Sequence, residues 1–312
     1  MAGDLLLRNT RLHGAGVDLL LRGGRIAEIG AAGSLEGEGE ILDARGGLLS
    51  RPFADPHIHL DAVLLGARTP NVSGTLQEGI RNWGRARESL TADDVQARAI
   101  EAIRWCVAQG TTRIRTHADT ASKVGVETLL ALREEVAHLC DLQVVAFPQD
   151  GVYTGPGREE ALRWAAAAGV DAIGAIPHHE ASREDGDRSV RLALDLAHQH
   201  GCQVDLHCDE TDDPKSRHLE TLCREVLARG FEPPVIAGHC TAMHSYPDDY
   251  ANQVIDLVVE SGVQVVANPL DNVVLQGRHD GYPRRRGITR VPELLAAGAK
   301  VGCGHDSIQD PW

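Results

Sequence analysis

The feature that most constrains the fold is an alternation of strand-like and helical stretches, which begins near Leu48 and repeats about every 30 residues. The strands are predicted to end near polar residues: His59, His117, Gln149, His178, His207, His239, Asn268 and Asp306. Amphipathic helices are predicted between them, over residues 92–108, 126–139, 159–168, 188–200, 216–228, 249–261 and 291–297. Several of these helices are followed by a glycine that can end them: Gly110, Gly169, Gly201, Gly230, Gly262 and Gly298. This alternation indicates an α/β fold with a parallel sheet.

Eight such strands over about 250 residues match the size of a (β/α)8 barrel of the TIM type, which is the fold class that we expect. The alternative is an open, doubly wound sheet. It is disfavoured because no G-x-G-x-x-G sequence follows the first strand, and because polar residues end nearly every strand instead of clustering at one switch point. In a barrel these strand ends meet at one mouth, where catalytic residues lie.

The N-terminal part of the chain follows a different pattern. Short strands are predicted at 4–7, 18–21, 25–29 and 41–43, with glycine-rich turns between them, which is typical of a small antiparallel sheet. We therefore expect residues 1–50 to form part of a small β domain and residues 51–312 to form the barrel. The connection between the first and second barrel strands is unusually long and contains residues 71–90. This segment is interpreted either as a lid over the barrel mouth or as a surface excursion. The chain stops at Trp312, directly after the eighth strand, which predicts a truncated protein without the last helix and the strands that complete the β domain.

Composition narrows the class of partner. The formal net charge of −14, from 31 basic and 45 acidic residues, opposes binding to a phosphate backbone. The N-terminus has no signal-peptide pattern, and no apolar run approaches the roughly 20 residues that span a bilayer. The seven cysteines are scattered without a C-x-x-C pair, which indicates reduced thiols rather than a disulfide framework. We expect a cytoplasmic homo-oligomer that acts on a small molecule and binds neither nucleic acid nor membrane.

The pentapeptide Pro56-His57-Ile58-His59-Leu60 ends the first barrel strand. Side chains alternate along a strand, so His57 and His59 point to the same side and can bind one metal ion. An isolated H-x-H pattern is more often a chance pair on a half-buried strand. The other strand ends change this balance, because they add further candidate ligands: His207, His239 and Asp306. Imidazoles and a carboxylate suit Zn²⁺ or Fe²⁺ with one position left for water, and a nearby carboxylate such as Glu210 can move protons.

The order H-x-H, His, His and Asp at the strand ends resembles that of the amidohydrolase superfamily. Longer motifs are similar to those of the bacterial cytosine deaminases and cover essentially the whole chain: Pro56-His-Ile-His-Leu60, Phe147-Pro-Gln-Asp150, Ile176-Pro-His178, Val204-Asp-Leu-His-Cys-Asp-Glu210, Thr241-Ala-Met-His-Ser-Tyr246, Gln276-Gly-Arg278, Tyr282-Pro-Arg-Arg-Arg-Gly-Ile-Thr-Arg290 and Gly304-His-Asp306. The resemblance implies hydrolysis of free cytosine to uracil and ammonia, with metal-bound hydroxide attacking the ring carbon. It also implies a role in pyrimidine salvage.

The resemblance assigns roles to particular residues. Most two-metal members of the superfamily carry a lysine at the end of strand four, whereas residues 172–180 contain none. One divalent ion, Fe²⁺ or Zn²⁺, is therefore implied, with four ligands: His57, His59, His207 and Asp306. Three catalytic residues are implied, which hold the water, accept its proton and protonate the ring: His239, Asp306 and Glu210. Two substrate-binding residues are implied: Gln149, which binds the amide edge of the ring, and Trp312, which helps to form the pocket wall. His178, at the end of the fourth strand, is a further candidate for lining the pocket and binding the substrate.

One departure from the family pattern leaves the substrate open. The motif at strand eight usually has two consecutive aspartates, and here the second is Ser307. The alternative substrates are isocytosine, creatinine or a triazine-like ring, and a third hypothesis is an inactive truncated fragment. The deaminase motif that combines H-x-E with P-C-x-x-C is absent from the sequence. For His117 and Asp119 a structural role is favoured over a role in the site, and five other histidines are expected at the surface: His138, His198, His200, His218 and His279.

Overall fold

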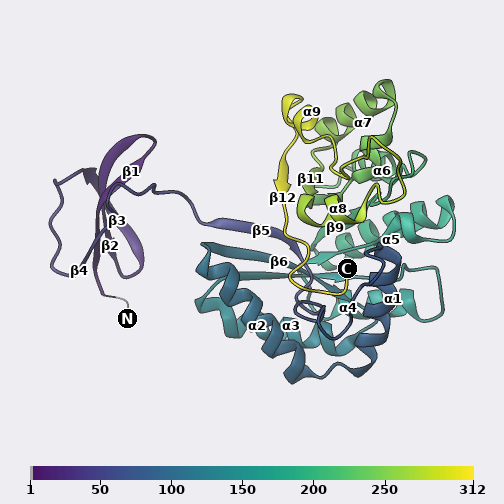
Figure 1. Ribbon diagram of the computed structural model, residues 1–312, viewed down its shortest axis with the longest axis horizontal. Coiled ribbons are helices and arrows are strands. Elements are labelled where there is room, and N and C mark those ends of the chain that lie inside the picture. The colour runs from purple at the N-terminus through teal and green to yellow at the C-terminus, as the bar shows by residue number, and fades with distance from the viewer. Residues whose placement is uncertain (1–2) are drawn as a thin grey trace. The chain divides into compact units, whose positions relative to one another are not determined.

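Residues 3–312 are described by a computed structural model, in which the chain forms two structural units divided between Pro52 and Phe53 (Figure 1). The first unit is a sheet in the order β3-β2-β1-β4, formed by β1 Leu5–Leu12, β2 Ala15–Arg22, β3 Arg25–Ala31 and β4 Glu40–Asp43. The first three strands pair antiparallel, as predicted, and β4 pairs with β1 in parallel. Both hairpin turns consist of two residues with positive φ, which matches the twist of the strands: His13-Gly14 and Gly23-Gly24.

The second unit is an eight-stranded sheet whose strands follow one another in chain order: β5 Phe53–Ile58, β6 Thr111–Asp119, β7 Asp141–Phe147, β8 Ala172–Ile173, β9 Gln203–Cys208, β10 Val235–His239, β11 Gln264–Ala267 and β12 Val301–Cys303. Neighbouring strands are parallel. A parallel bridge between Ile58 and Asp306 brings the end of the chain back to β5, so the sheet is nearly closed. The structure therefore confirms the (β/α)8 barrel over the open sheet.

Helices follow the strands of this unit (Figure 1): α1 Leu76–Ala86, α2 Ala92–Ala108, α3 Lys123–Glu135, α4 Arg158–Ala167, α5 Arg183–His200, α6 His218–Arg229, α7 Asp248–Ser261, α8 Pro269–Leu275 and α9 Val291–Ala296. α1 and α8 were not expected as helices. α5 begins earlier than predicted because the Ser182 hydroxyl accepts a hydrogen bond from the Asp185 N–H and caps the helix. The predicted stop glycines all have positive φ: Gly110, Gly169, Gly201, Gly230, Gly262 and Gly298. In residues 3–312, no helix is both long enough and apolar enough to cross a membrane.

The main hydrophobic core lies between the barrel sheet and its helices, and the barrel interior carries many polar side chains. On β6, Ile114 and Ala118 belong to this core together with Ala99 of α2. Arg115 and His117 alternate with them and therefore face the other side of the sheet, into the barrel. The fold thus keeps most apolar packing outside the sheet, while the barrel interior holds charged groups and imidazoles, with Phe147 stacked on His207.

Candidate active site

The carboxyl ends of the strands bring the four predicted metal ligands together. His57 lies on β5 with His59 directly after it, His207 lies on β9, and Asp306 follows β12. Oδ1 of Asp306 lies 3.5 Å from Nε2 of His57 and 3.4 Å from Nε2 of His59. Nε2 of His59 lies 3.2 Å from Nε2 of His207. All four side chains are buried.

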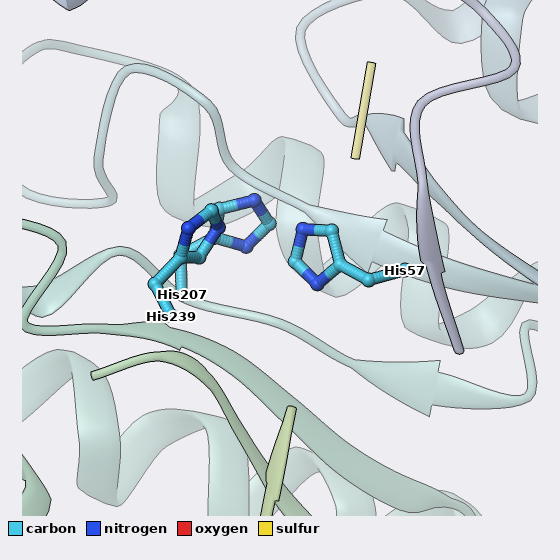
Figure 2. A group of neighbouring side chains, drawn as sticks. All are labelled: His57, His207 and His239. Carbon is cyan, nitrogen blue, oxygen red and sulfur yellow. The ribbon is translucent and has the colours of Figure 1, made fainter. Parts of the chain in front are cut away.

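The donor atoms of this cluster suit a divalent metal ion. Both ring nitrogens of His57 and Nδ1 of His207 are buried without a hydrogen-bond partner among residues 3–312. Ligand atoms of His57, His59 and Asp306 lie within 4.8 Å of one another, and so do those of His57, His207 and His239. Figure 2 shows the rings of the latter three pointing toward one another. Imidazoles with a carboxylate are ligands that Zn²⁺ and Fe²⁺ accept, so the residues present fit such an ion.

His239 differs from His57 because both of its ring nitrogens have hydrogen-bond partners. Nδ1 lies 3.2 Å from Oδ1 of Asn272, and Nε2 lies 3.1 Å from Nδ2 of Asn268. Asn272 also donates a hydrogen bond from Nδ2 to Oε1 of Glu210 over 3.1 Å. The same Glu210 oxygen lies 3.2 Å from Nδ1 of His239. These four side chains form one connected polar group beside the metal-ligand cluster.

Burial and neighbouring groups shift the pKa values of two carboxyl groups in opposite directions. Burial alone would raise the pKa of Asp306, but its interactions with the surrounding histidines, including hydrogen bonds from His57 and His59, together outweigh burial and hold that pKa well below its usual value. Burial raises the pKa of Glu210 well above its usual value, and the charge of Asp306 adds to the rise. Asp306 is therefore suited to be an ionised ligand and Glu210 to hold a proton. Two carboxyl groups with diverging pKa values are typical of general acid–base pairs.

A small pocket adjoins the cluster, with this wall: His59, Leu76, Gln149, His207, Glu210, His239, Asp271, Asp306 and Trp312. Two of the three predicted substrate-binding residues, Gln149 and Trp312, are part of this wall. His178 is not; it lies on the turn Pro177–His179 after β8, with Nδ1 buried and without a partner in the described chain. Burial lowers the pKa of His178 to about 3.

The segment 71–90, which we call the lid segment, contributes to the pocket wall. Leu76, the first residue of α1, lines the pocket. Gly79, one turn further along α1, lies against Trp312, because a Cβ atom at Gly79 would be 2.6 Å from the Trp312 Cβ atom. The structure therefore favours the lid interpretation over a surface excursion.

Asp119, at the end of β6, holds the lid segment in place. Nε1 of Trp83 donates to Oδ2 of Asp119 over 2.8 Å, and Nη1 of Arg87 donates to the same oxygen over 2.6 Å. Nη2 of Arg87 also pairs with Oδ2 of Asp150, which follows β7. Trp83 is 1% exposed and packs with its ring centroid 6.2 Å from that of Trp312. The lid segment is thus tied by hydrogen bonds to two strand ends.

The junction of β11 and α8 supplies three polar residues that the sequence analysis did not assign to the site: Asn268, Asp271 and Asn272. Their spacing of three and four residues places them on one side of a helical turn. Asp271 lines the pocket, where burial and the charge of Asp306 raise its pKa well above the usual value. A recognisable signal was available, because these residues directly follow a strand end with helical spacing.

Buried polar side chains continue from His57 along the barrel interior. The ring centroids of His57 and His117 lie 4.1 Å apart. Nε2 of His117 lies 3.8 Å from Oδ1 of Asp205, whose Oδ2 accepts a hydrogen bond from Nη1 of Arg115 over 2.9 Å. Asp205 precedes His207 by two residues on β9, so both side chains point into the barrel. His117 and Asp119 both lie outside the pocket wall.

The expected surface position is wrong for His218, which is 4% exposed. His218 begins α6, where Asp209 accepts hydrogen bonds from the N–H groups of His218 and Leu219 over 3.0 and 2.8 Å. Nδ1 of His218 lies 3.1 Å from Oδ1 of Asp187 on α5. The capped N-terminus of α6 therefore holds the imidazole ring of His218 against α5. The other four histidines are exposed, as predicted: His138, His198, His200 and His279.

Two residues of the pocket wall have left-handed backbone conformations. The φ angle is 65° at His239 and 66° at Asp306. Residues with a Cβ atom adopt this region at a cost of about 1–2 kcal/mol each. Such backbone strain is concentrated at functional sites, where the surrounding fold stabilises it.

Fold and site together define an α/β-barrel protein with a metal-binding cluster at the carboxyl ends of its strands. The sequence profile of the amidohydrolase family matches residues 40–312, and the chain belongs to this family. The resemblance seen in the sequence motifs is thereby confirmed at the family level.

Three relatives are similar along almost the whole chain. Pterin deaminase from Rhizobium rhizogenes is 32% identical, over 95% of this chain and 68% of its own length. N-isopropylammelide isopropyl amidohydrolase from Pseudomonas is 27% identical, over 99% of this chain and 75% of its own. Structures of 5-methylcytosine deaminase from Klebsiella pneumoniae with 5-fluorocytosine or phosphonocytosine match with a TM-score of 0.93 at 41% identity, over 99% of this chain and 76% of that chain.

Proposed function

We propose that this protein is a metal-dependent deaminase that hydrolyses free cytosine, and cytosine substituted at carbon 5, to the corresponding uracil and ammonia. The observation that carries the proposal is the pocket itself, whose wall combines Glu210 and Gln149 with members of the metal-ligand cluster. The similarity to 5-methylcytosine deaminase supports this class of ring. The similarity to pterin deaminase supports hydrolytic deamination of a nitrogen heterocycle in general.

The proposed chemistry divides proton transfer between two carboxyl groups. A divalent ion held by His57, His59, His207 and Asp306 supplies Lewis acidity at this position. Asp306 accepts a proton from the attacking water through Oδ2, which lies 3.8 Å from Nε2 of His239. His239 hydrogen-bonds the attacking oxygen. Glu210 donates its proton to the ring nitrogen beside the attacked carbon, which the raised pKa of this carboxyl group allows.

Substrate binding is assigned to Gln149 and Trp312. Gln149 follows β7 and lies in the pocket wall, where its amide can pair with the carbonyl and N–H groups of a pyrimidinone edge. Trp312 stands edge-on to His59, with ring centroids 5.2 Å apart, and covers the pocket beside the metal-ligand cluster. Exclusion of water there strengthens the electrostatic interactions with the ring. His178 lies outside the pocket wall, and we assign it no contact with the substrate.

Ser307 supports the inclusion of 5-substituted rings. Its hydroxyl donates a hydrogen bond to Oδ1 of Asp310. A serine is smaller than the aspartate of the family motif and carries no charge. We therefore expect more room beside Asp306, at the edge of the ring, than an aspartate would leave.

The test is ammonia release by the metal-loaded protein from a panel of rings. The panel contains cytosine, 5-methylcytosine, isocytosine, creatinine, pterin and cytidine. We expect release from cytosine and 5-methylcytosine and none from cytidine, because the proposed substrate is the free base. Release from creatinine or pterin alone would contradict the proposed substrate while leaving deamination intact. No release from any ring would contradict the proposed function.

The biological setting is part of the same proposal. A formal net charge of −14 supports a small substrate rather than a nucleic acid. We propose a cytoplasmic homo-oligomer in pyrimidine salvage, which light scattering on the purified protein and growth on cytosine as the nitrogen source would test.

A further inference from the structure

We infer that Asp271 holds the amino group that leaves the ring, by accepting a hydrogen bond from one of its N–H groups. The inference rests on the proposed function and deepens it, because it adds a contact to the leaving group in the same pocket. Asp271 lies in the first turn of α8 and is part of the pocket wall. It is 7% exposed, so bulk water does not readily compete for its carboxyl group.

Two residues of the pocket wall are neither metal ligands nor assigned to the water or the ring: Leu76 and Asp271. The amino group is likewise the one polar substituent of cytosine without a partner, since Gln149 pairs with the amide edge and Glu210 with the ring nitrogen. Leu76 is apolar, so Asp271 is the side chain left for the amino group. In the described part of the chain, Asp271 belongs to none of the side-chain groups that could share a metal ion.

Asp271 also has an acceptor that the fold does not use. Its Oδ2 atom is buried and has no hydrogen-bond partner among residues 3–312, so the N–H groups in the first turn of α8 do not occupy it. Buried polar atoms usually have a partner, and the amino group of a bound ring would supply one. A carboxyl group offers an acceptor oxygen whether it is protonated or ionised, so the contact does not depend on the protonation of Asp271.

The neighbours of Asp271 are the two groups that transfer protons in the proposed reaction. Burial and the charges of Asp306 and Glu210 raise the pKa of Asp271, so both carboxyl groups lie near it. Asp306 acts on the water and Glu210 on the ring nitrogen, on either side of the attacked carbon. The amino group is bonded to that carbon and therefore lies close to Asp271 as well.

The hydrogen bond helps the carbon–nitrogen bond to break. After water has added and Glu210 has protonated the ring nitrogen, the amino nitrogen takes up the proton that Asp306 removed from the water. The bond breaks with its electron pair on nitrogen, ammonia leaves, and the proton of the added hydroxyl group returns to Glu210. An acceptor for one N–H group orients the nitrogen so that its lone pair can face Asp306. This contact strengthens as ammonia forms, so it stabilises the transition state more than the bound substrate.

Kinetics of the metal-loaded enzyme with cytosine test the contact through two substitutions of similar size. We expect Asp271→Leu, which removes the acceptor, to lower kcat about 10- to 100-fold, the range of one strong hydrogen bond. Asp271→Asn keeps an acceptor oxygen, so its kcat should stay within about fivefold of the parent. Val274→Ala, at an exposed position of α8, is the matched control and should leave kcat unchanged.

Inhibition by 2-pyrimidinone separates this contact from a structural role. This ring lacks the amino group, so its inhibition constant should not rise in Asp271→Leu. A rise by the same factor as the loss with cytosine would overturn the inference, and so would a kcat of Asp271→Leu within about threefold of the parent. If Asp271→Leu does not fold, Asp271→Ala takes its place in both measurements.

The proposed function fails separately, if the parent releases ammonia from no ring. Calorimetry on the zinc-loaded Glu210→Gln protein then decides on the contact. We expect cytosine to bind about tenfold more tightly than 2-pyrimidinone, and this preference to disappear when Asp271→Leu is added. Equal binding of the two rings in the Glu210→Gln protein, or a preference that survives Asp271→Leu, would overturn the inference.

Discussion

Replacing Asp119 with alanine should loosen the lid segment and weaken the barrel. Oδ2 of Asp119 accepts hydrogen bonds from the indole N–H of Trp83 over 2.8 Å and from the guanidinium of Arg87 over 2.6 Å. Asp119 is 2% exposed and Trp83 1% exposed, so water does not readily replace the lost carboxylate. A single substitution therefore removes both attachments of the lid segment to the end of β6.

The magnitude follows from the two groups that lose their acceptor. An N–H group left buried without a partner costs about 1–3 kcal/mol, which applies to Trp83. Breaking a buried ion pair costs about 3–5 kcal/mol. Arg87 keeps Asp150 as a partner and its side chain is 17% exposed, so we take about 1–2 kcal/mol for this part. Together these give about 2–5 kcal/mol, a large share of the about 5–15 kcal/mol that stabilises a typical protein.

Denaturant unfolding followed by tryptophan fluorescence measures this loss, because all 4 tryptophans lie in the second structural unit. The variant should also raise KM more than it lowers kcat, since Leu76 lines the pocket and Trp83 packs against Trp312. Arg163→Ala, which removes an exposed pair with Glu159, is the control and should cost less than about 1 kcal/mol. A loss below about 1 kcal/mol in Asp119→Ala, with KM unchanged, would refute the reasoning.

Three further predictions concern the metal, the mechanism and pH. Metal analysis should find near one equivalent per chain, which His59→Ala should lose; two tightly bound equivalents would contradict a single-metal site. In steady-state kinetics, Glu210→Gln should lower kcat about 10²- to 10⁴-fold while the metal is retained. Gln149→Ala should instead raise KM at least as much as it lowers kcat. A kcat of Glu210→Gln within a few-fold of the parent would exclude the proton-donor role. Burial lowers the pKa of His178 from its ordinary value of 6.5 to about 3. The unfolded chain therefore binds a proton at this imidazole more readily than the folded chain, and stability is lost as pH falls from 6.5 toward 3. In unfolding measured across that range, His178→Gln should show a shallower loss than the parent, and identical slopes would contradict the lowered pKa.

The architecture was predictable because its signals are local. Strand alternation places His57 and His59 on one side, and stop glycines mark the helix ends, so strand order and the metal-ligand cluster follow from short stretches of sequence. The polar contacts around the site are not local. Asn272 meets Glu210 across 62 residues of sequence, and Trp83 meets Asp119 across 36. Such pairs depend on loop lengths and on helix rotation, which residue patterns do not determine.

The left-handed backbone at His239 and Asp306 has a consequence for anyone who evolves this protein in the laboratory. Glycine adopts that conformation without the penalty that a Cβ atom brings. A library screened only for survival of heating would therefore enrich replacements at these two positions. The selected variants would be more thermostable but inactive, and the screen would not detect the loss of activity. Selection for turnover must accompany selection for thermostability in every round.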